Sequence, residues 1–343
     1  MRTYFLMLAA LFIAANLFAQ GERKDKTAVT YEEMYDEPYS VNKLFVHLVP
    51  LYGEVFATNI NAGFGLEASY YLSDKADFKA QFRKTYSQKF YDFSRDLAQK
   101  NSDVDNRFEV FNYYELGGTY HIRDFEQSSK TKMFLYKKSY KGNKWAARVP
   151  LNAEIPCKVR KIYGARLGGI AWNSATDLNR ALDKQGLTNN DLKDPEGNGL
   201  PLTFNDGNNE QTLDVFSNIS SYGGYVGGSI TWIKNVAVNF DKYEEGVDDL
   251  IFTAYLDVLF APSLNIDDVV YQGTPYDVSA IDLKKFGVRA GIEGKFNRTL
   301  SWAYGGEIGY RPSIEGRAFY ALLKISFPVF GTNLDYKVES FGK

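Results

Sequence analysis

The chain has little of several residue types on which common classes of protein depend. Its single cysteine, Cys157, excludes an intramolecular disulfide. Its two histidines, His47 and His121, lie in no His-Glu-x-x-His motif, and there is no Gly-x-Ser-x-Gly elbow or Walker loop. Clusters of His, Cys or carboxylates at metal-ligand spacing are also missing from the sequence. We therefore expect no enzyme activity, no cofactor and no bound metal.

Charge of one sign and long apolar runs are scarce as well. The formal net charge is −2 over 343 residues, so the chain lacks the basic footprint of a nucleic-acid-binding protein. After residue 19 no stretch reaches the roughly eighteen apolar residues that a membrane-spanning helix needs. A mean hydropathy of −0.33 still allows a membrane protein, because strands can hide an apolar half in alternation.

The one apolar run stands at the N-terminus. Arg2 is a short positive region, residues 4–18 are apolar apart from Asn16, and Ala19-Gln20 offers a cleavage point after a small residue. This pattern predicts a secretory signal peptide at residues 1–19, since the run is short for a membrane span. We expect an exported chain that begins at Gln20.

Alternation with a period of two is the strongest pattern in the rest of the sequence. Between Phe286 and Phe296, apolar residues such as Val288 and Ile292 alternate with glycines and with charged residues such as Arg289 and Glu293. A period of two predicts β-strands that are apolar on one side. Aromatic residues make up 16% of the chain, as interfacial girdles require. A soluble β-sandwich also alternates, but it rarely places Arg and Glu between glycines on successive inner faces.

The pattern predicts an all-β fold: a single transmembrane antiparallel up-and-down β-barrel of about twelve strands, with ten to fourteen possible. The expected strands are 44–52, 60–73, 76–86, 107–123, 130–138, 145–157, 162–173, 220–240, 249–261, 282–296, 299–311 and 317–328. The barrel then covers residues 44–328, between an N-terminal tail at 20–43 and a C-terminal tail at 329–343.

The predicted connections support this topology, because short ones alternate with long ones. The short set is 74–75, 124–129, 158–161, 241–248 and 297–298, and the other set is 53–59, 87–106, 139–144, 174–219, 262–281 and 312–316. Both termini then fall in the periplasm and the long loops outside the cell. Loop 174–219 is the longest, and residues 175–185 within it have the composition of a short helix. It is either a lid or partner-binding surface, or a solvated loop.

If the apolar faces point outward, charged residues of both signs line the lumen. They are Glu67, Glu115, Arg148, Glu154, Arg166, Asp257, Arg289, Glu293, Glu307, Arg311 and Lys324, with His121 beside them. Such charges either pair across the lumen and hold it closed, or line a narrow wet channel. The alternation leaves both readings open.

The signal ending LFAQ and the hairpins GFGLEASYYLSDK and FGVRAGIEGKFNRTLSWAYGGEIGY resemble those of outer-membrane β-barrel proteins of Bacteroidota-type bacteria. The resemblance implies a barrel embedded in outer-membrane lipid that serves as a structural or partner-binding component of a cell-envelope complex for secretion, gliding or barrel assembly. Partners would bind through loop 174–219 or the terminal tails. The alternatives are a narrow porin-like channel for small hydrophilic solutes and, on weaker grounds, an outer-membrane lipid hydrolase.

Overall fold

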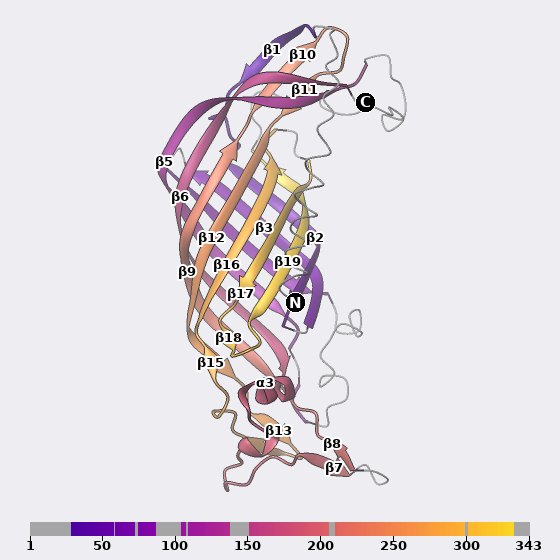
Figure 1. The fold of residues 1–343 in the computed structure, drawn as a ribbon, viewed down its shortest axis with the longest axis vertical. Helices are drawn as coiled ribbons and strands as arrows, with labels where there is room; N and C mark the ends of the chain where they lie inside the picture. Colours follow the sequence, from indigo (N-terminus) through magenta and orange to yellow (C-terminus); the bar gives the residue numbers. More distant parts are fainter. Residues whose placement is uncertain are drawn as a thin grey trace, which may run out of the picture.

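A closed antiparallel barrel of ten strands forms the body of the molecule (Figure 1). The computed structural model describes residues 29–57, 59–72, 75–86, 104–107, 109–137, 151–205, 210–298 and 301–332. The expected signal peptide, Arg148 and residues 333–343 of the C-terminal tail lie outside these ranges. The strands are β2 (Leu44–Phe56), β3 (Asn59–Leu72), β4 (Ala76–Thr85), β5 (Asn112–Leu135), β6 (Leu151–Asp177), β9 (Phe216–Ile233), β12 (Leu250–Ile266), β16 (Phe286–Phe296), β17 (Ala303–Tyr310) and β19 (Phe319–Gly331).

The all-β antiparallel barrel is as expected from the sequence, but the expected twelve strands are ten. Segments 107–123 and 130–138 overlap a single strand, β5, which runs from Asn112 to Leu135, and segments 145–157 and 162–173 overlap another, β6, which runs from Leu151 to Asp177. The two strands pair without a turn from Asn112↔Asn173 to Leu135↔Leu151. Connections 124–129 and 158–161, expected to be turns, are therefore the middle of a long hairpin.

The long hairpin also bears on one expected outer loop, because the described strands before and after it are β5 and β6. Residues 139–144, expected among the outer loops, belong to the connection between β5 and β6. They lie outside the described residues, but Lys137 just before them bridges to Tyr243, at the barrel end where the described chain begins and finishes. At that end Lys43 N–H donates to Thr332 Oγ1 at 2.9 Å. This bond joins the start of β2 to the end of β19.

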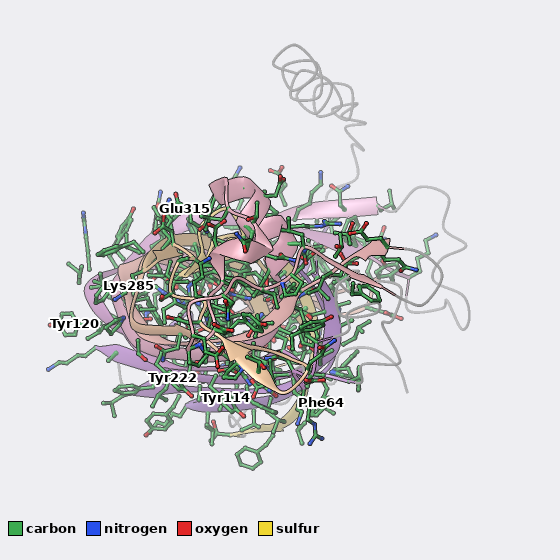
Figure 2. The ribbon with its side chains drawn as sticks, turned by 90° about the horizontal axis from the view of Figure 1, so that it is seen from below. Phe64, Tyr114, Tyr120, Tyr222, Lys285 and Glu315 are labelled. Carbon is green, nitrogen blue, oxygen red and sulfur yellow. The ribbon has the colours of Figure 1, made fainter. Side chains whose placement is uncertain are left out.

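The wall of the barrel has its apolar side chains outside and its charged side chains inside. Leu256, Leu323 and Leu167 are exposed by 63%, 74% and 70% respectively, whereas Asp257 and Arg289 are exposed by 0% and 1%. Successive residues of a strand point to opposite faces, so Leu256 lies on the outer face and its neighbour Asp257 lies on the inner face. Figure 2 shows the interior filled by side chains and the rings of Tyr114, Tyr120 and Tyr222 projecting outward.

Aromatic pairs ring the outer surface at two levels. Near one end lie Trp232 with Phe252, Trp302 with Tyr304, and Phe125 with Tyr163. Near the other lie Phe260 with Phe286, Tyr310 with Phe319, and Phe82 with Tyr114. Phe252 and Phe260 are both on β12, and eight strand residues tilted by about 40° rise roughly 20 Å along the barrel axis. This is close to the apolar band of about 25 Å between aromatic girdles in outer-membrane barrels.

A folded cap covers the end to which the long connections lead, at the bottom of Figure 1. The connection after β6 contains α3 (Leu178–Gln185), the 3₁₀ turn η3 (Asn189–Asp191), and the hairpin of β7 (Thr203–Asn205) and β8 (Glu210–Thr212). The Asp177 side chain caps α3 by accepting from Arg180 N–H at 3.2 Å, and Gly186 ends the helix at a φ of 71°. Buried Leu178, Leu182 and Leu213 pack with barrel aromatics such as Trp172.

Two further short pairs of strands lie in the later connections at this end. They are β13 (Val269–Tyr271) with β14 (Thr274–Tyr276), and β15 (Leu283–Lys284) with β18 (Ser313–Ile314). Val269 and Tyr276 join the same apolar cluster as α3. The loops at this end therefore form one packed unit. The expected helix at 175–185 corresponds to α3.

A small β-structure outside the barrel occupies the opposite end. Strand β1 (Tyr31–Asp36), within the expected N-terminal tail, pairs with β10 (Val236–Phe240), which pairs with β11 (Gly246–Asp248). Their buried residues Val238 and Phe240 pack on Met133, Ile155 and Cys157 of the protruding β5–β6 hairpin. We refer to β1, β10, β11 and residues 124–135 and 151–159 as the terminal sandwich.

Candidate functional site

The interior charges of the barrel form ion pairs across the lumen. Asp257 on β12 lies between two arginines and accepts from Arg166 Nε at 3.0 Å and from Arg289 Nε at 2.8 Å. Arg289 in turn donates from Nη1 and Nη2 to both carboxylate oxygens of Glu115, at 2.9 and 2.7 Å. Tyr113 O–H also donates to Glu115 at 2.7 Å. This chain of groups links four strands that do not all neighbour one another, β6, β12, β16 and β5.

A second set of pairs lies next to it, toward the cap. Arg311 donates from Nη1 and Nη2 to the two oxygens of Glu54, at 2.9 and 2.5 Å. Arg83 Nη1 approaches the same carboxylate at 3.6 Å, and the Arg83 guanidinium stacks on the Tyr113 ring at 4.0 Å. Glu307 accepts from Tyr255 O–H at 2.9 Å and from Tyr320 O–H at 3.3 Å. All of these charged side chains are buried.

A third set lies toward the terminal sandwich and surrounds a polar cavity of about 80 Å³. Glu293 accepts from Lys324 Nζ at 2.9 Å and also pairs with Lys79, while Lys324 pairs with Glu67 as well. His121 Nε2 contacts Asp77 Oδ2 at 3.0 Å. The side chains here are more accessible than those of the centre, with Glu293 exposed by 25% and Asp257 by 0%.

Charge in the centre of the lumen is balanced. Four arginines, Arg83, Arg166, Arg289 and Arg311, face four carboxylates, Glu54, Glu115, Asp257 and Glu307, and all eight groups are buried. Buried charges of this kind are tolerated only when each is compensated. The arrangement can hold opposite walls of the barrel together, and it leaves no cavity in the central layer comparable with the one beside Lys324.

Small residues make room for these long side chains. A Cβ atom at Gly227 would lie 2.1 Å from Asp257 Oδ1, and one at Gly291 would lie 2.4 Å from the Tyr255 ring. Glycine is required at both positions because no other residue leaves the space that the carboxylate and the ring fill. The glycines between the charges in the sequence are thus part of the ion-pair layer.

Most of the residues expected in the lumen lie in its interior. These are Glu67, Glu115, Arg166, Asp257, Arg289, Glu293, Glu307, Arg311 and Lys324, together with His121. Glu154 does not, because it lies on the part of β6 that leaves the barrel, where its side chain is 62% exposed and 3.9 Å from Lys130. Arg148 is outside the described residues.

Several interior groups were not among the expected residues. They are His47, Glu54, Asp77, Lys79, Arg83 and Lys295. All occupy polar positions in alternating strands, so the alternation that identified Glu67 and Arg289 also identifies them. Glu54 in particular lies beyond the expected end of its strand at residue 52, because β2 continues to Phe56.

The sequence matches no protein-family model and no curated protein. In the described part of the chain, no helix is long and apolar enough to cross a membrane, and no three His, Cys, Asp or Glu side chains gather as metal ligands would.

Proposed function

We propose that this chain is an integral outer-membrane β-barrel with a sealed lumen, which acts as an anchored structural or partner-binding component of a cell-envelope complex. The observation that carries the proposal is the neutral ion-pair layer that crosses the lumen, from Arg166 through Asp257 and Arg289 to Glu115. A barrel closed in this way can act as a membrane anchor that exposes the cap at one end and the terminal sandwich at the other.

The wall has apolar side chains outside and charged side chains inside, the reverse of a water-soluble protein, and this supports placement in a membrane. Water would penalise the exposed leucines at positions 167, 256 and 323, whereas lipid solvates them. The two levels of aromatic pairs fit the two interfaces of a bilayer. In this proposal the signal peptide exports the chain, the terminal sandwich lies in the periplasm and the cap lies outside the cell.

The packing of the lumen favours an anchor over a channel. A narrow porin needs a continuous wet path, but here Arg289 and Asp257 are exposed by 1% and 0% at mid-height. The cap adds a second barrier, because Leu178 and Leu182 of α3 are buried at exposures of 0% and 1% against the barrel mouth. The proposal assigns neither transport nor catalysis to the chain.

Conductance of the purified full-length chain in planar lipid bilayers tests the sealed lumen. We expect no stable single-channel steps for the wild-type protein. Removing the cap residues 187–212 should not produce them either, because the ion-pair layer remains. Discrete steps in the wild type, with an ion selectivity that changes on Arg289→Gln substitution, would instead establish the porin-like channel.

Co-purification tests the partner-binding role. The full chain is isolated from gently solubilised membranes of its own host, beside a variant without residues 20–36 that lacks β1. We expect a stoichiometric partner with the full chain, and its loss from the variant locates the contact at the terminal sandwich. Retention of the partner excludes β1 as the contact and points to the cap or the C-terminal tail. A chain that purifies without any stoichiometric partner contradicts the proposed role but leaves the membrane barrel untouched.

A further inference from the structure

One cation in the lumen differs from all the others. Lys295 reaches from β16 across the lumen, and its Nζ donates to Ser69 Oγ on β3 at 2.6 Å. Its ammonium also lies 4.4 Å from the Phe45 ring centre and 4.8 Å from that of Tyr71. Among the described residues, no carboxylate lies within ion-pairing distance of this ammonium, although six other interior cations each have one. Those six are Lys79, Arg83, Arg166, Arg289, Arg311 and Lys324.

The carboxylates nearest to this part of the lumen already have other cationic or histidine partners. Glu67 and Glu293 pair with Lys324, and Asp77 contacts His121. The hydroxyls of Thr231 and Thr253 bond to each other at 2.9 Å. Lys295 therefore keeps donor capacity that no protein carboxylate fills.

Lys295 lines the polar cavity of about 80 Å³ that lies between the ion pairs and the terminal sandwich. The cavity has room for roughly two or three waters, at about 30 Å³ each, or for one small anion. His47 and Ser69 line the same cavity from β2 and β3, so further polar groups are available beside the ammonium. Burial of a cation that forms no direct ion pair of its own is costly, and a small anion in the adjoining space lowers that cost.

We propose that the cavity is a binding site for one small anion, a halide or a carboxylate of the size of formate, held by Lys295. Lys295 supplies the charge, and the rings of Phe45 and Tyr71 fix the position of its ammonium. Ser69 keeps the side chain extended across the lumen. The site lies on the terminal-sandwich side of the ion-pair layer, so it takes its ligand from that side and conducts nothing across the membrane.

Thermal unfolding of the full-length chain in detergent micelles, titrated with sodium bromide or sodium formate, tests the site. Sodium gluconate, whose anion is too large for the cavity, keeps the ionic strength constant. We expect the unfolding temperature to rise with bromide or formate and to saturate, because an anion bound only by the folded state stabilises it. Bromide and formate are compared separately, which shows whether the site prefers halide or carboxylate.

Variants show whether Lys295 is responsible. Lys295→Met should abolish the saturable rise or weaken the affinity at least tenfold, and Lys295→Arg should retain it. Lys285→Met removes an exposed lysine at the cap end and should bind as the wild type does. Ser69→Ala keeps the ammonium and should weaken binding by a few fold, which provides a test even if Lys295→Met does not fold.

Anomalous diffraction from bromide-soaked crystals gives an independent measurement. We expect a peak in the cavity within contact distance of Lys295 Nζ. The proposal is overturned if the wild-type unfolding temperature responds equally to gluconate and bromide, or if Lys295→Met and the wild type respond alike.

Discussion

Arg289 on β16 and Glu115 on β5 form a two-point ion pair across the barrel, with Nη–Oε distances of 2.9 and 2.7 Å. The two strands are not neighbours in the barrel, so this contact joins opposite parts of the wall. Both side chains are 1% exposed. Removing one partner of so deeply buried a pair should cost more than removing both, because a single substitution leaves the other charge buried without a counter-charge.

Replacing Arg289 with Met should therefore lower the free energy of unfolding by about 3–5 kcal/mol, and so should Glu115→Leu. The double variant should lose less than the sum of the two single variants, because no unpaired charge remains. Urea titration in micelles, followed by tryptophan fluorescence, measures the three values. The exposed pair Lys130–Glu154 is the control, and Lys130→Ala should cost at most about 1 kcal/mol. Strict additivity of the Arg289 and Glu115 effects would contradict the pairing.

The apolar outer wall gives a second prediction, which tests the membrane placement directly. Leu256 lies mid-wall and is 63% exposed, whereas Leu202 lies in the cap and is 52% exposed. An arginine at the middle of a bilayer costs about 2–4 kcal/mol, and an arginine in water costs almost nothing. Leu256→Arg should thus lower the free energy of unfolding in lipid vesicles by that amount, while Leu202→Arg should leave it unchanged. Equal effects of the two substitutions would place the wall in water.

The sequence predicts the barrel wall well because the two faces of its strands differ in polarity. With an apolar outer face and a charged lumen, every second residue of a wall strand is apolar, and segments such as 249–261 and 282–296 show this clearly. The same alternation places Arg289, Glu293 and Asp257 inside. It does not state which charges pair, since Arg289 and Glu115 are 174 residues apart and their contact depends on how ten strands close.

The predicted strand count was wrong where this difference between the two faces ends. β4 pairs with β5 only as far as Tyr120, and β9 pairs with β6 only as far as Arg160. Beyond these points the β5–β6 hairpin leaves the wall, and residues 126–130 are exposed on both faces. Their polar composition resembles that of a turn, although the backbone remains extended. The alternation is lost there because this part of the hairpin lies outside the wall and is exposed on both faces, and not because the chain reverses.

The close packing of glycine against the ion pairs gives a third prediction. A Cβ at Gly227 would lie 2.1 Å from Asp257 Oδ1 and 2.2 Å from the Leu256 carbonyl oxygen, whereas a Cβ at Gly53 meets nothing within 4 Å. Gly227→Ala should therefore displace Asp257 and lower the free energy of unfolding by about 1–3 kcal/mol, the usual cost of overpacking. Gly53→Ala should be neutral or slightly stabilising, because it only restricts the unfolded chain. Urea titration of both variants measures the difference, and similar stabilities would contradict the close contact.

Cys157 gives a fourth prediction, which concerns the terminal sandwich. Burial among Val238, Phe240 and Ile155 raises the pKa of this thiol to about 11. Since the thiolate is the reactive form, a rise from an ordinary pKa of about 9 reduces its population at pH 8 by roughly a hundredfold. The folded chain should thus react slowly with iodoacetamide at pH 8, and the rate should climb as the pH approaches 11. The raised pKa also makes the free energy of unfolding depend on pH. The contribution of the neutral thiol to stability is fully present below pH 9 and is lost as the pH rises to 11.

Packing of β10 against the hairpin shields this thiol, and β10 is paired with β1, so the shielding should depend on both strands. Removing residues 20–36 deletes β1 and should speed Cys157 alkylation by at least tenfold, while the barrel still migrates as a folded band in unheated gels. Ser129→Cys in a Cys157→Ser background is the matched control, because Ser129 is exposed directly opposite Cys157 on β5. That thiol should react quickly with or without β1. If Cys157 in the intact chain reacts as fast as this control, then the sandwich is not packed in solution and the N-terminal segment is free of the hairpin.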